Sequence, residues 1–397
     1  MIVTYKYKLY NEQDLYPLNN LTNIAGNIYN HCIALHKKYY KLFGKHLNKF
    51  QLQKHLTKLK KRDKYSYWKS LGSQAIQELT ERIEEGYQKF FKWVTKKSQV
   101  KSGIPTFKKS LEYPSFKMKG YVGYKLNNNR ITINKKSYKF KKYRDFSGEI
   151  KTCTIKRNKY GEFFVIISVE ESKFEKLPHT GNAVGMDFGL KIFLTTSDNE
   201  QIIMPQYFKK SLKQVRKLNR ILSHKKLGSN NRKRAKIKLS KLQEKIANQR
   251  NDWQWKTAYD LVKRYDIIKI EDLNISAMKK LWGRKVSDLA YASFVNKVEH
   301  LCNKYEKELI KIDRFFPSSK TCSSCGNIDS SINKDIKDLN NRIYHCKECH
   351  LIIDRDYNAA INILNYREQM KYIKRVDKHV QLSDYKTSVM EANHVLS

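Results

Sequence analysis

The sequence predicts an α+β protein with several domains, and three observations support this. Apolar residues recur at helical spacing through residues 20–95, whereas short runs typical of strands follow after residue 103. Two Cys-x2-Cys motifs interrupt the last third of the chain, where strand and helix patterns alternate. The 397 residues exceed a single ordinary core, and a hydrophobic content of 40% argues against disorder. We therefore expect about two to four domains.

Residues 20–95 are predicted to form a helical lobe without proline and with few glycines. Lysines crowd this region, which suits a lobe that lies along a phosphate backbone, although a merely soluble helix face is the alternative for any one lysine. Two apolar stripes recur at steps of three or four residues: Leu21, Ile24, Ile28, Cys32 and Leu35, then Ala75, Ile76, Leu79, Ile83, Tyr87, Phe90, Phe91 and Trp93. The lysines are Lys37, Lys38, Lys41, Lys45, Lys49, Lys58, Lys60 and Lys61.

The pattern changes to strands after residue 103, which predicts a β-domain. Strands are expected at residues 130–133, 152–156 and 163–169, and residues 158–161 form a hairpin turn between the last two. Residues 3–9 alternate in the same way. We therefore expect the N-terminal segment to add a strand to this sheet, with the helical lobe inserted between.

From residue 183 the chain is predicted to run as a strand over 186–195, a turn over 197–200 and a strand over 201–203, followed by long helices. One helix carries an apolar stripe formed by Ala235, Leu239, Leu242, Ile246 and Trp253. Acidic partners for salt bridges are nearly absent from its other faces, so a nucleic-acid backbone is the better partner for the cations there. These cations are Arg232, Lys233, Arg234, Lys236, Lys238, Lys241, Lys245 and Arg250.

Three acidic residues indicate a metal-dependent nuclease whose sequence is split. Asp187 and Glu271 each interrupt or end a short apolar run that reads as a buried strand, and Asp356 opens an apparent helix. Carboxylates at such ends can converge on Mg²⁺, which prefers oxygen ligands and keeps several waters. Two ions about 4 Å apart would activate water and stabilise the leaving oxygen of a phosphodiester. Each acid alone reads as a solvated surface group, but three in these contexts favour a site.

The charge of the chain predicts its partner. There are 80 Lys and Arg against 38 Asp and Glu, which gives a formal net charge of +42 and a sequence pI of about 9.8. A polyanion would neutralise this excess, so nucleic acid is expected. A membrane surface is the competing interpretation, but neither an amphipathic anchor nor a lipidation signal is found. The apolar run 163–169 is too short to span a bilayer and the N-terminus has no signal-peptide pattern, which predicts a cytoplasmic protein.

Seven cysteines divide into four ligands and three others. Cys322, Cys325, Cys346 and Cys349 form a C-x2-C, x20, C-x2-C array that can close a tetrahedral zinc site. Disulfides are the alternative, and the absence of a secretory signal argues against them. His345 and His350 flank the second motif and could compete as ligands, although four thiolates already fill a structural site. The remaining cysteines are expected to be small buried residues: Cys32, Cys153 and Cys302.

The order of these features is informative, because the zinc array lies between Glu271 and Asp356. With its motifs in this order, the chain resembles the TnpB family of transposon-encoded nucleases, which are relatives of the type V CRISPR effectors. The resemblance runs nearly from end to end, through residues 5–10, 105–108, 185–189, 246–250, 271–274, 316–326 and 354–363. One departure is His350, where many relatives have glycine, so the backbone turn there is expected to be less relaxed.

The resemblance implies a RuvC-like nuclease of RNase H fold with an inserted zinc ribbon. A helical recognition lobe, inserted in a wedge β-barrel domain, precedes it. The expected divisions are a wedge strand (1–10), a recognition lobe (11–105), a wedge β-domain (106–180), a first nuclease segment (181–315), a zinc ribbon (316–352), a second nuclease segment (353–368) and a C-terminal tail (369–397).

The resemblance also implies an RNA-guided DNA endonuclease of a transposable element. Such a protein binds a guide RNA made from its element's own end and cuts double-stranded DNA beside a short adjacent motif. It acts as a monomer within the ribonucleoprotein, in the prokaryotic cytoplasm or nucleoid. Two Mg²⁺ ions, with Mn²⁺ as an alternative, and one structural Zn²⁺ are implied as cofactors.

In that family the catalytic metal ligands fall at positions occupied here by Asp187, Glu271 and Asp356. Asp354 does not match a ligand, but could orient the site. Gln77, in a Gln-Ala-Ile-Gln context, lies near positions that read the adjacent motif. The cationic residues expected to contact nucleic acid are Lys49, Lys233, Arg234, Lys238, Lys241 and Arg250.

Two other classes of protein remain as alternatives. A guided repressor that had lost cleavage would keep the charge and zinc ribbon but would lack one of the three acids. A resolvase or transposase acting without RNA would share the acids and the metal chemistry, yet would not need the helical lobe or this much charge. RNA that copurifies with the protein would discriminate between these classes.

Overall fold

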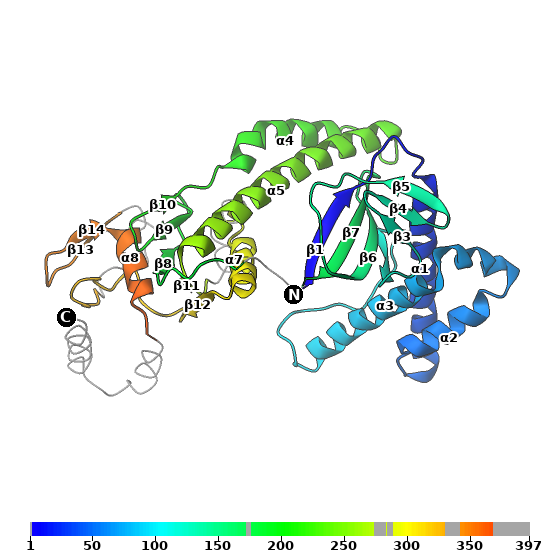
Figure 1. The fold of residues 1–397 in the computed structure, drawn as a ribbon, viewed down its shortest axis with the longest axis horizontal. Helices are drawn as coiled ribbons and strands as arrows, with labels where there is room; N and C mark the ends of the chain where they lie inside the picture. The colour runs from blue at the N-terminus through cyan, green and yellow to red at the C-terminus, as the bar shows by residue number, and fades with distance from the viewer. Residues whose placement is uncertain (1, 172–175, 274–282, 284–288, 330–341, 368–397) are drawn as a thin grey trace. The chain divides into compact units, whose positions relative to one another are not determined.

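A computed structural model describes residues 2–171, 176–273, 283, 289–329 and 342–367 (Figure 1). The chain divides into two compact units, Met1–Lys173 and Phe174–Ser397, and each is described by itself. The expected C-terminal tail, 369–397, lies outside the described residues. Among the described helices, none is long and apolar enough to cross a membrane.

The first unit is built on an antiparallel sheet in the order β1-β7-β6-β2. Its strands are β1 (Ile2–Lys8), β7 (Phe163–Glu170), β6 (Glu149–Arg157) and β2 (Ser115–Lys119). Every second residue of β7 is buried, and β6 and β7 join at the expected hairpin. The pairing of β1 with β7 confirms that the N-terminal segment adds a strand to this sheet.

A second sheet of the first unit contains β3 (Lys125–Asn127), β4 (Arg130–Ile133) and β5 (Lys136–Lys139). A bridge between Leu9 and Phe140 and a hydrogen bond from Lys141 N to Lys8 O link the end of β1 to this region. The described strands thus form two sheets joined at one corner. Closure into the wedge barrel stays a prediction.

Helices separate β1 from β2 in the sequence, as the change of periodicity predicted. They are α1 (Tyr16–Phe43), α2 (Lys49–Leu59), η1 (Asp63–Leu71) and α3 (Ser73–Val94), and a short η2 (Ser110–Glu112) follows. A proline lies in the first turn of α1, and Gly44 ends that helix in the left-handed conformation. Asn48 and Gln51 form a capping box that starts α2.

Buried charges tie these helices to the large sheet. Glu78 of α3 has a side chain only 1% exposed and pairs with Lys117 and with Lys119 of β2, the latter at 2.8 Å. Arg157, at the end of β6, donates to the backbone O of Leu111 at 2.8 Å and of Tyr113 at 3.0 Å. Because an uncompensated buried charge is costly, these pairs restrict how α3 and η2 can dock.

The second unit contains a five-stranded mixed sheet in the order β10-β9-β8-β11-β12. Its strands are β8 (Ala183–Asp187), β9 (Leu194–Thr196), β10 (Gln201–Ile202), β11 (Ile267–Glu271) and β12 (Glu308–Ile312). β8, β11 and β12 are parallel, whereas β9 and β10 are antiparallel to their neighbours. The prediction of a single strand over 186–195 is therefore wrong. The chain leaves β8 after Asp187 and turns back into β9.

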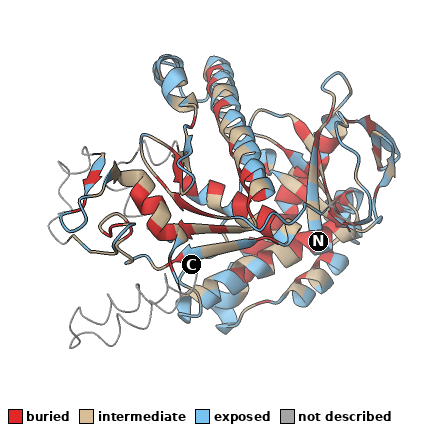
Figure 2. Cartoon of the chain, turned by 60° about the vertical axis from the view of Figure 1, so that its left-hand side comes forward, coloured by how far each residue is buried: buried red, intermediate tan, exposed pale blue. Residues whose placement is uncertain are grey.

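Helices cover both faces of this sheet. α5 (Asn230–Arg264) and α7 (Tyr291–Tyr305) share one hydrophobic core with β8 and β11, and α8 (Arg355–Leu364) contacts β8, β9 and β11. The start of α5 packs against α4 (Tyr207–Ser223) instead. Ala235, Leu239 and Ile246 of the predicted stripe are buried, but Trp253 packs into the sheet core. Figure 2 shows the buried residues gathered on the strands and the inner helix faces.

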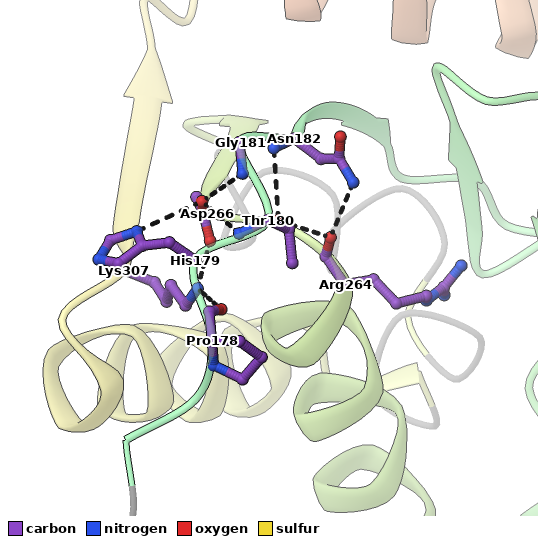
Figure 3. Close-up of polar contacts among 8 residues, drawn as sticks. All are labelled: Pro178, His179, Thr180, Gly181, Asn182, Arg264, Asp266 and Lys307. Atoms are coloured by element: carbon purple, nitrogen blue, oxygen red, sulfur yellow. Dashed lines mark hydrogen bonds and ion pairs between the residues drawn. The ribbon is translucent and has the colours of Figure 1, made fainter.

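A polar network holds the amino ends of the three parallel strands together (Figure 3). Asp266 precedes β11 and accepts from the backbone N–H groups of Thr180 at 2.9 Å and Gly181 at 2.7 Å. Lys307, which precedes β12, donates its fully buried ammonium to Asp266 and to Pro178 O at 2.7 Å. These contacts, above all that of Lys307, hold the pKa of Asp266 well below its usual value.

Replacing Asp266 by asparagine is expected to lower the unfolding temperature of the protein by several degrees at pH 7, because the buried Lys307 ammonium loses its counter-charge. A carboxyl whose folded pKa is depressed stabilises the fold above its unfolded pKa of about 3.9 and loses that effect as the pH falls. The difference between wild type and Asp266→Asn in thermal scans should therefore shrink below about pH 4. Asp260→Asn, which removes a more exposed pair with Arg264, is the control and should change little. Equal effects of the two substitutions would contradict this assignment.

Candidate nuclease and zinc sites

Two of the three predicted acids lie at the same edge of the mixed sheet. β8 and β11 are parallel neighbours, and their register pairs Met186 with Ile270. Asp187 and Glu271 are the next residues on the two strands, and each is the last of its strand. Both side chains therefore leave the carboxyl ends of adjacent parallel strands, where sites form in open α/β sheets.

The third acid is brought to this edge by α8. A Cβ at Gly185 of β8 would lie 2.2 Å from Ala360 O and 2.4 Å from Leu364 N, so only glycine lets the helix backbone approach this closely. Asp356 lies in the first turn of α8. A Cβ at Gly189, just after β8, would lie 3.8 Å from Asp356 Oδ2. Gly185 thus makes room for α8, whereas at Gly189 a Cβ would lie 2.6 Å from Ile192 O, so that glycine permits the loop after β8.

Asp354, the neighbouring acid, has a structural task. It is the N-cap of α8, and its Oδ1 accepts from Tyr357 N at 2.9 Å. Such a cap satisfies a backbone donor that has no partner within the helix. Asp354 therefore begins the helix that carries Asp356, which agrees with the orienting role expected of it.

The electrostatics couple Asp187 to both of the other acids. Burial raises the pKa of Asp187 well above its usual value, and the negative charges of Glu271 and Asp356 raise it further. Burial also raises the pKa of Glu271, against a lowering by the Ser318 hydroxyl, and that of Asp356, against a lowering by Arg342. Such a group of half-buried oxygen donors fits Mg²⁺ or Mn²⁺, because a cation would relieve the repulsion.

Three further residues border the site and were missed from the sequence. The Tyr291 hydroxyl donates to Gly189 O, and burial together with the charge of Asp187 raises the pKa of Tyr291. Arg342 Nη1 donates to Asp356 Oδ2, and Ser318 donates to Glu271. Tyr291 and Arg342 lie outside any recognised motif. Ser318 lies within the 316–326 motif, but its hydroxyl carries no chemical signal by itself.

Four cysteines form the second site. Among the described His, Cys, Asp and Glu side chains, theirs are the only set of three or more whose ligand atoms all lie within 4.8 Å of one another. Sγ of Cys322 and Cys349 are 3.6 Å apart, as are those of Cys325 and Cys346. Tetrahedral zinc with Zn–S bonds of about 2.3 Å requires sulfur atoms about 3.8 Å apart. The arrangement therefore fits one zinc ion, and the flanking histidines are not part of it.

The pKa values of the thiols differ within this group. Hydrogen bonding from the backbone of Leu351 lowers the pKa of Cys349 to about 7, whereas burial raises that of Cys325 to about 12. Because zinc binds thiolates, the ion must displace the proton of each thiol whose pKa is raised. The other three cysteines, Cys32, Cys153 and Cys302, are buried, as predicted.

The two Cys-x2-Cys motifs, called the zinc knuckles, are each followed by a residue in the left-handed backbone conformation. Gly326 follows the first Cys-x2-Cys at φ 73°, and His350 follows the second at φ 57°. A glycine adopts this conformation freely, but a histidine does so at a cost. The less relaxed turn expected at His350 is thus confirmed.

The residues predicted to contact nucleic acid differ in their exposure to solvent and in their partners. Gln77 is exposed on α3, and Lys233, Arg234, Lys238 and Lys241 are exposed on α5. Arg250 is half-buried on the same helix. Lys49, at the start of α2, lies 3.4 Å from Glu81 and over the ring of Phe50, so some of its charge is already compensated.

Comparison with known proteins agrees with this geometry. A family model described as "Probable transposase" matches residues 165–281, and a Cas12f1-like TNB domain matches residues 291–363. A Streptomyces pristinaespiralis protein named "Putative RNA-guided DNA endonuclease" is 30% identical over 315 residues, which are 78% of this chain and 75% of that protein. A TnpB-like protein of Acanthamoeba polyphaga mimivirus is 34% identical over 200 residues, 46% of this chain and 37% of that one. The chain belongs to the TnpB family.

A solved structure shares the fold of this TnpB-family chain. It is a cryo-EM structure of Cas12f1 with sgRNA and target DNA, which has a TM-score of 0.59 and 18% sequence identity. The match covers 89% of this chain and 83% of that chain. The chain therefore shares the fold of Cas12f1, and membership of the TnpB family, inferred from the motifs, is confirmed.

The purified protein is expected to contain about one zinc ion per chain by elemental analysis. Cys322→Ser or Cys346→Ser should lower that content and the unfolding temperature, because structural zinc contributes on the order of 10 kcal/mol to folding. Cys302→Ala, which changes a buried cysteine outside the cluster, should leave the zinc content unchanged. A folded wild-type protein that carries no zinc after expression in zinc-supplemented medium would contradict the assignment.

Proposed function

We propose that this chain is an RNA-guided DNA endonuclease of a transposable element. It cuts double-stranded DNA next to a short adjacent motif by two-metal-ion hydrolysis of a phosphodiester bond. The proposal is carried by two observations: Asp187 and Glu271 end adjacent parallel strands, and the charges of Glu271 and Asp356 both act on Asp187. The guide RNA is made from the element's own end, and the protein works as a monomer within the ribonucleoprotein in the prokaryotic cytoplasm or nucleoid.

The three carboxylates would hold Mg²⁺, with Mn²⁺ as a substitute. When bound, two such ions supply an activated water and stabilise the leaving oxygen of the phosphodiester. Asp187 gains most from the cations, since its anionic form is opposed by burial and by both neighbouring acids. The sheet holds Asp187 and Glu271, while α8 holds Asp356, so the ligands are positioned by rigid elements before the substrate arrives.

The charge distribution supports guidance by RNA. A net charge of +42 and the exposed cations of α5 suit the backbone of a heteroduplex, which a protein can hold by its shape. Guide pairing then supplies sequence specificity, so no helix-turn-helix or tandem base-reading fingers are needed. The name of the Streptomyces relative and the sgRNA–DNA complex of Cas12f1 point to the same function.

The finer architecture belongs to the same proposal. β8–β12 with α5, α7 and α8 form the RuvC-like RNase H fold, and the zinc ribbon is inserted over residues 316–352. In the first unit, α1–α3 form the recognition lobe, and the two sheets form the wedge domain. We propose that Gln77, which is exposed on α3, reads the adjacent motif. The presence of all three acids argues against a cleavage-deficient repressor.

Asp187→Ala, Glu271→Ala and Asp356→Ala should each lower the rate of DNA cleavage with Mg²⁺ by roughly a thousandfold or more. RNA and DNA binding should persist, because backbone contacts are spread over many cations. Asp354→Ala is the matched control: it should cost about 1 kcal/mol of helix stability through the lost cap and retain cleavage. Cleavage and filter-binding assays test this. An inactive Asp354→Ala beside an active Asp356→Ala would show that the third ligand is misassigned.

Cleavage should require RNA and should move when the guide is rewritten. The test strips RNA from the protein and reconstitutes it with two RNAs that differ only in the guide. Cuts are then mapped on a plasmid library with randomised flanking bases. Binding should weaken steeply with salt, since many phosphates are neutralised at once. Cuts that ignore the guide, or occur equally without RNA, would leave an RNA-independent nuclease or transposase as the function.

A further inference from the structure

A short segment between β12 and the first zinc knuckle touches both halves of the nuclease site. We name this segment, residues 314–323, the bracket. At its start, Arg314 donates from Nε to Asp272 O at 2.9 Å and from Nη2 to Asp272 Oδ2 at 2.5 Å. Four residues later, the hydroxyl of buried Ser318 donates to Glu271 Oε1. The bracket is thus attached to two consecutive residues at the end of β11.

The same segment is attached to the helix that carries Asp356. Asn362 Nδ2 donates to the backbone O of Ser318 at 2.8 Å and of Thr321 at 2.6 Å. One turn earlier, Asn358 Nδ2 donates to Thr321 O at 2.8 Å, and its Oδ1 accepts from Ser323 N at 2.9 Å. Both asparagines are buried on one face of α8, so their amides depend on these partners.

The far end of the bracket is the first zinc knuckle. Cys322 lies within it, and Cys322 N donates to Asn327 O at 2.8 Å across the knuckle turn. Ligation of Cys322 would fix the backbone that Asn358 and Asn362 hold. The cysteine cluster is therefore connected to the acids through the bracket. On one side the bracket contacts Glu271, and on the other it contacts α8, which carries Asp356.

We propose that Ser318 is a positioning residue for Glu271, and that the zinc knuckle holds it in place through Asn358 and Asn362. This inference rests on the proposed nuclease function. A glutamate has three rotatable side-chain bonds, and a fixed donor on one carboxylate oxygen restricts its rotamers while leaving the other oxygen for a cation. Ser318 acts through Glu271 and need not touch the substrate.

The geometry separates this role from a purely structural one. The side chain of Ser318 contacts Glu271, whereas its backbone carbonyl contacts Asn362. Replacing the side chain of Ser318 therefore removes the hydrogen bond to Glu271 and leaves the hydrogen bonds between the bracket and α8 in place. A loss of cleavage on removal of this hydroxyl would come from the carboxylate and not from a loosened ribbon.

The experiment compares Ser318→Ala, Ser318→Thr and Ser319→Ala in the complete ribonucleoprotein. Ser319 is the adjacent serine, and its hydroxyl makes no hydrogen bond with Glu271 in the described residues of the chain. Cleavage is measured over a series of MgCl₂ concentrations, alongside zinc content, unfolding temperature and DNA affinity. Ser318→Ala should lower the cleavage rate about 10- to 100-fold and raise the MgCl₂ concentration needed for half-maximal rate. Zinc content and DNA affinity should stay at the wild-type level.

Ser318→Thr keeps the hydroxyl and should restore most of the rate, and Ser319→Ala should behave as wild type. If Ser318→Ala cleaves as fast as an active wild type, with the same dependence on MgCl₂, the inference is overturned while the proposed function stays intact. Failure of the wild-type complex to cleave would instead overturn the proposed function. A threonine variant as slow as the alanine variant, despite normal folding and zinc content, would also contradict the role of the hydroxyl.

The link to α8 is tested by a double-substitution cycle. Asn362→Ala should slow cleavage, and adding it to Ser318→Ala should slow it less than the product of the two single effects, because both act through Glu271. If the double variant instead slows cleavage by the full product of the two single effects, Asn362 and Ser318 act independently. The proposed link from Ser318 to α8 would then be overturned. If Asn362→Ala does not fold, Ser318→Ala and Ser318→Thr still decide the central claim.

Discussion

The backbone of α8 lies directly on β8 because residue 185 is glycine, and the candidate active site depends on this contact. A single Cβ at that position would meet backbone atoms of the helix at little more than 2 Å. The contact sets the height of α8 above the sheet, and with it the position of Asp356 relative to Asp187. The same helix uses Asn358 and Asn362 to hold the zinc knuckle. One small residue therefore allows two sites, separated in sequence, to share a single helix.

The acids impose an electrostatic cost on the fold that carries them. Three carboxylates around one sheet edge are partly removed from water, and the raised pKa values record how unfavourable their charged forms are there. A structure selected only for stability would not gather them. Two neighbouring groups partly offset this cost: Arg342 pairs with Asp356, and Ser318 donates to Glu271. A cation bound by these carboxylates would neutralise the same charges and would thereby stabilise the fold.

Charge acts at two scales in this molecule. Around the acids, single hydrogen bonds and ion pairs at short distances decide protonation and orientation. Along α5, many exposed cations lie on one helix and can act together. The first kind of charge suits chemistry at one phosphodiester, whereas the second suits a long phosphate backbone whose sequence is not read by side chains. In the proposed function, the strong positive excess and the few acids would act on the same substrate.

Much of the chain was predictable from its sequence, because the relevant signals are local. Helical and strand periods located most elements, the cysteine spacing predicted the four-cysteine cluster, and the position of the three acids at element ends predicted the candidate nuclease site. The prediction of one strand over 186–195 was wrong because a loop over 188–193 separates two strands, and the apolar residues on both sides of that loop are buried. Trp253 packs in a different core from the rest of its predicted stripe, because the start of α5 packs on α4 and its later part packs on the sheet. Only the tertiary structure could reveal Tyr291, Arg342 and Ser318 beside the acids, since hydroxyl and guanidinium groups are common in any sequence. Their role comes from contacts between residues far apart in the chain, which side-chain packing decides and local periodicity does not encode.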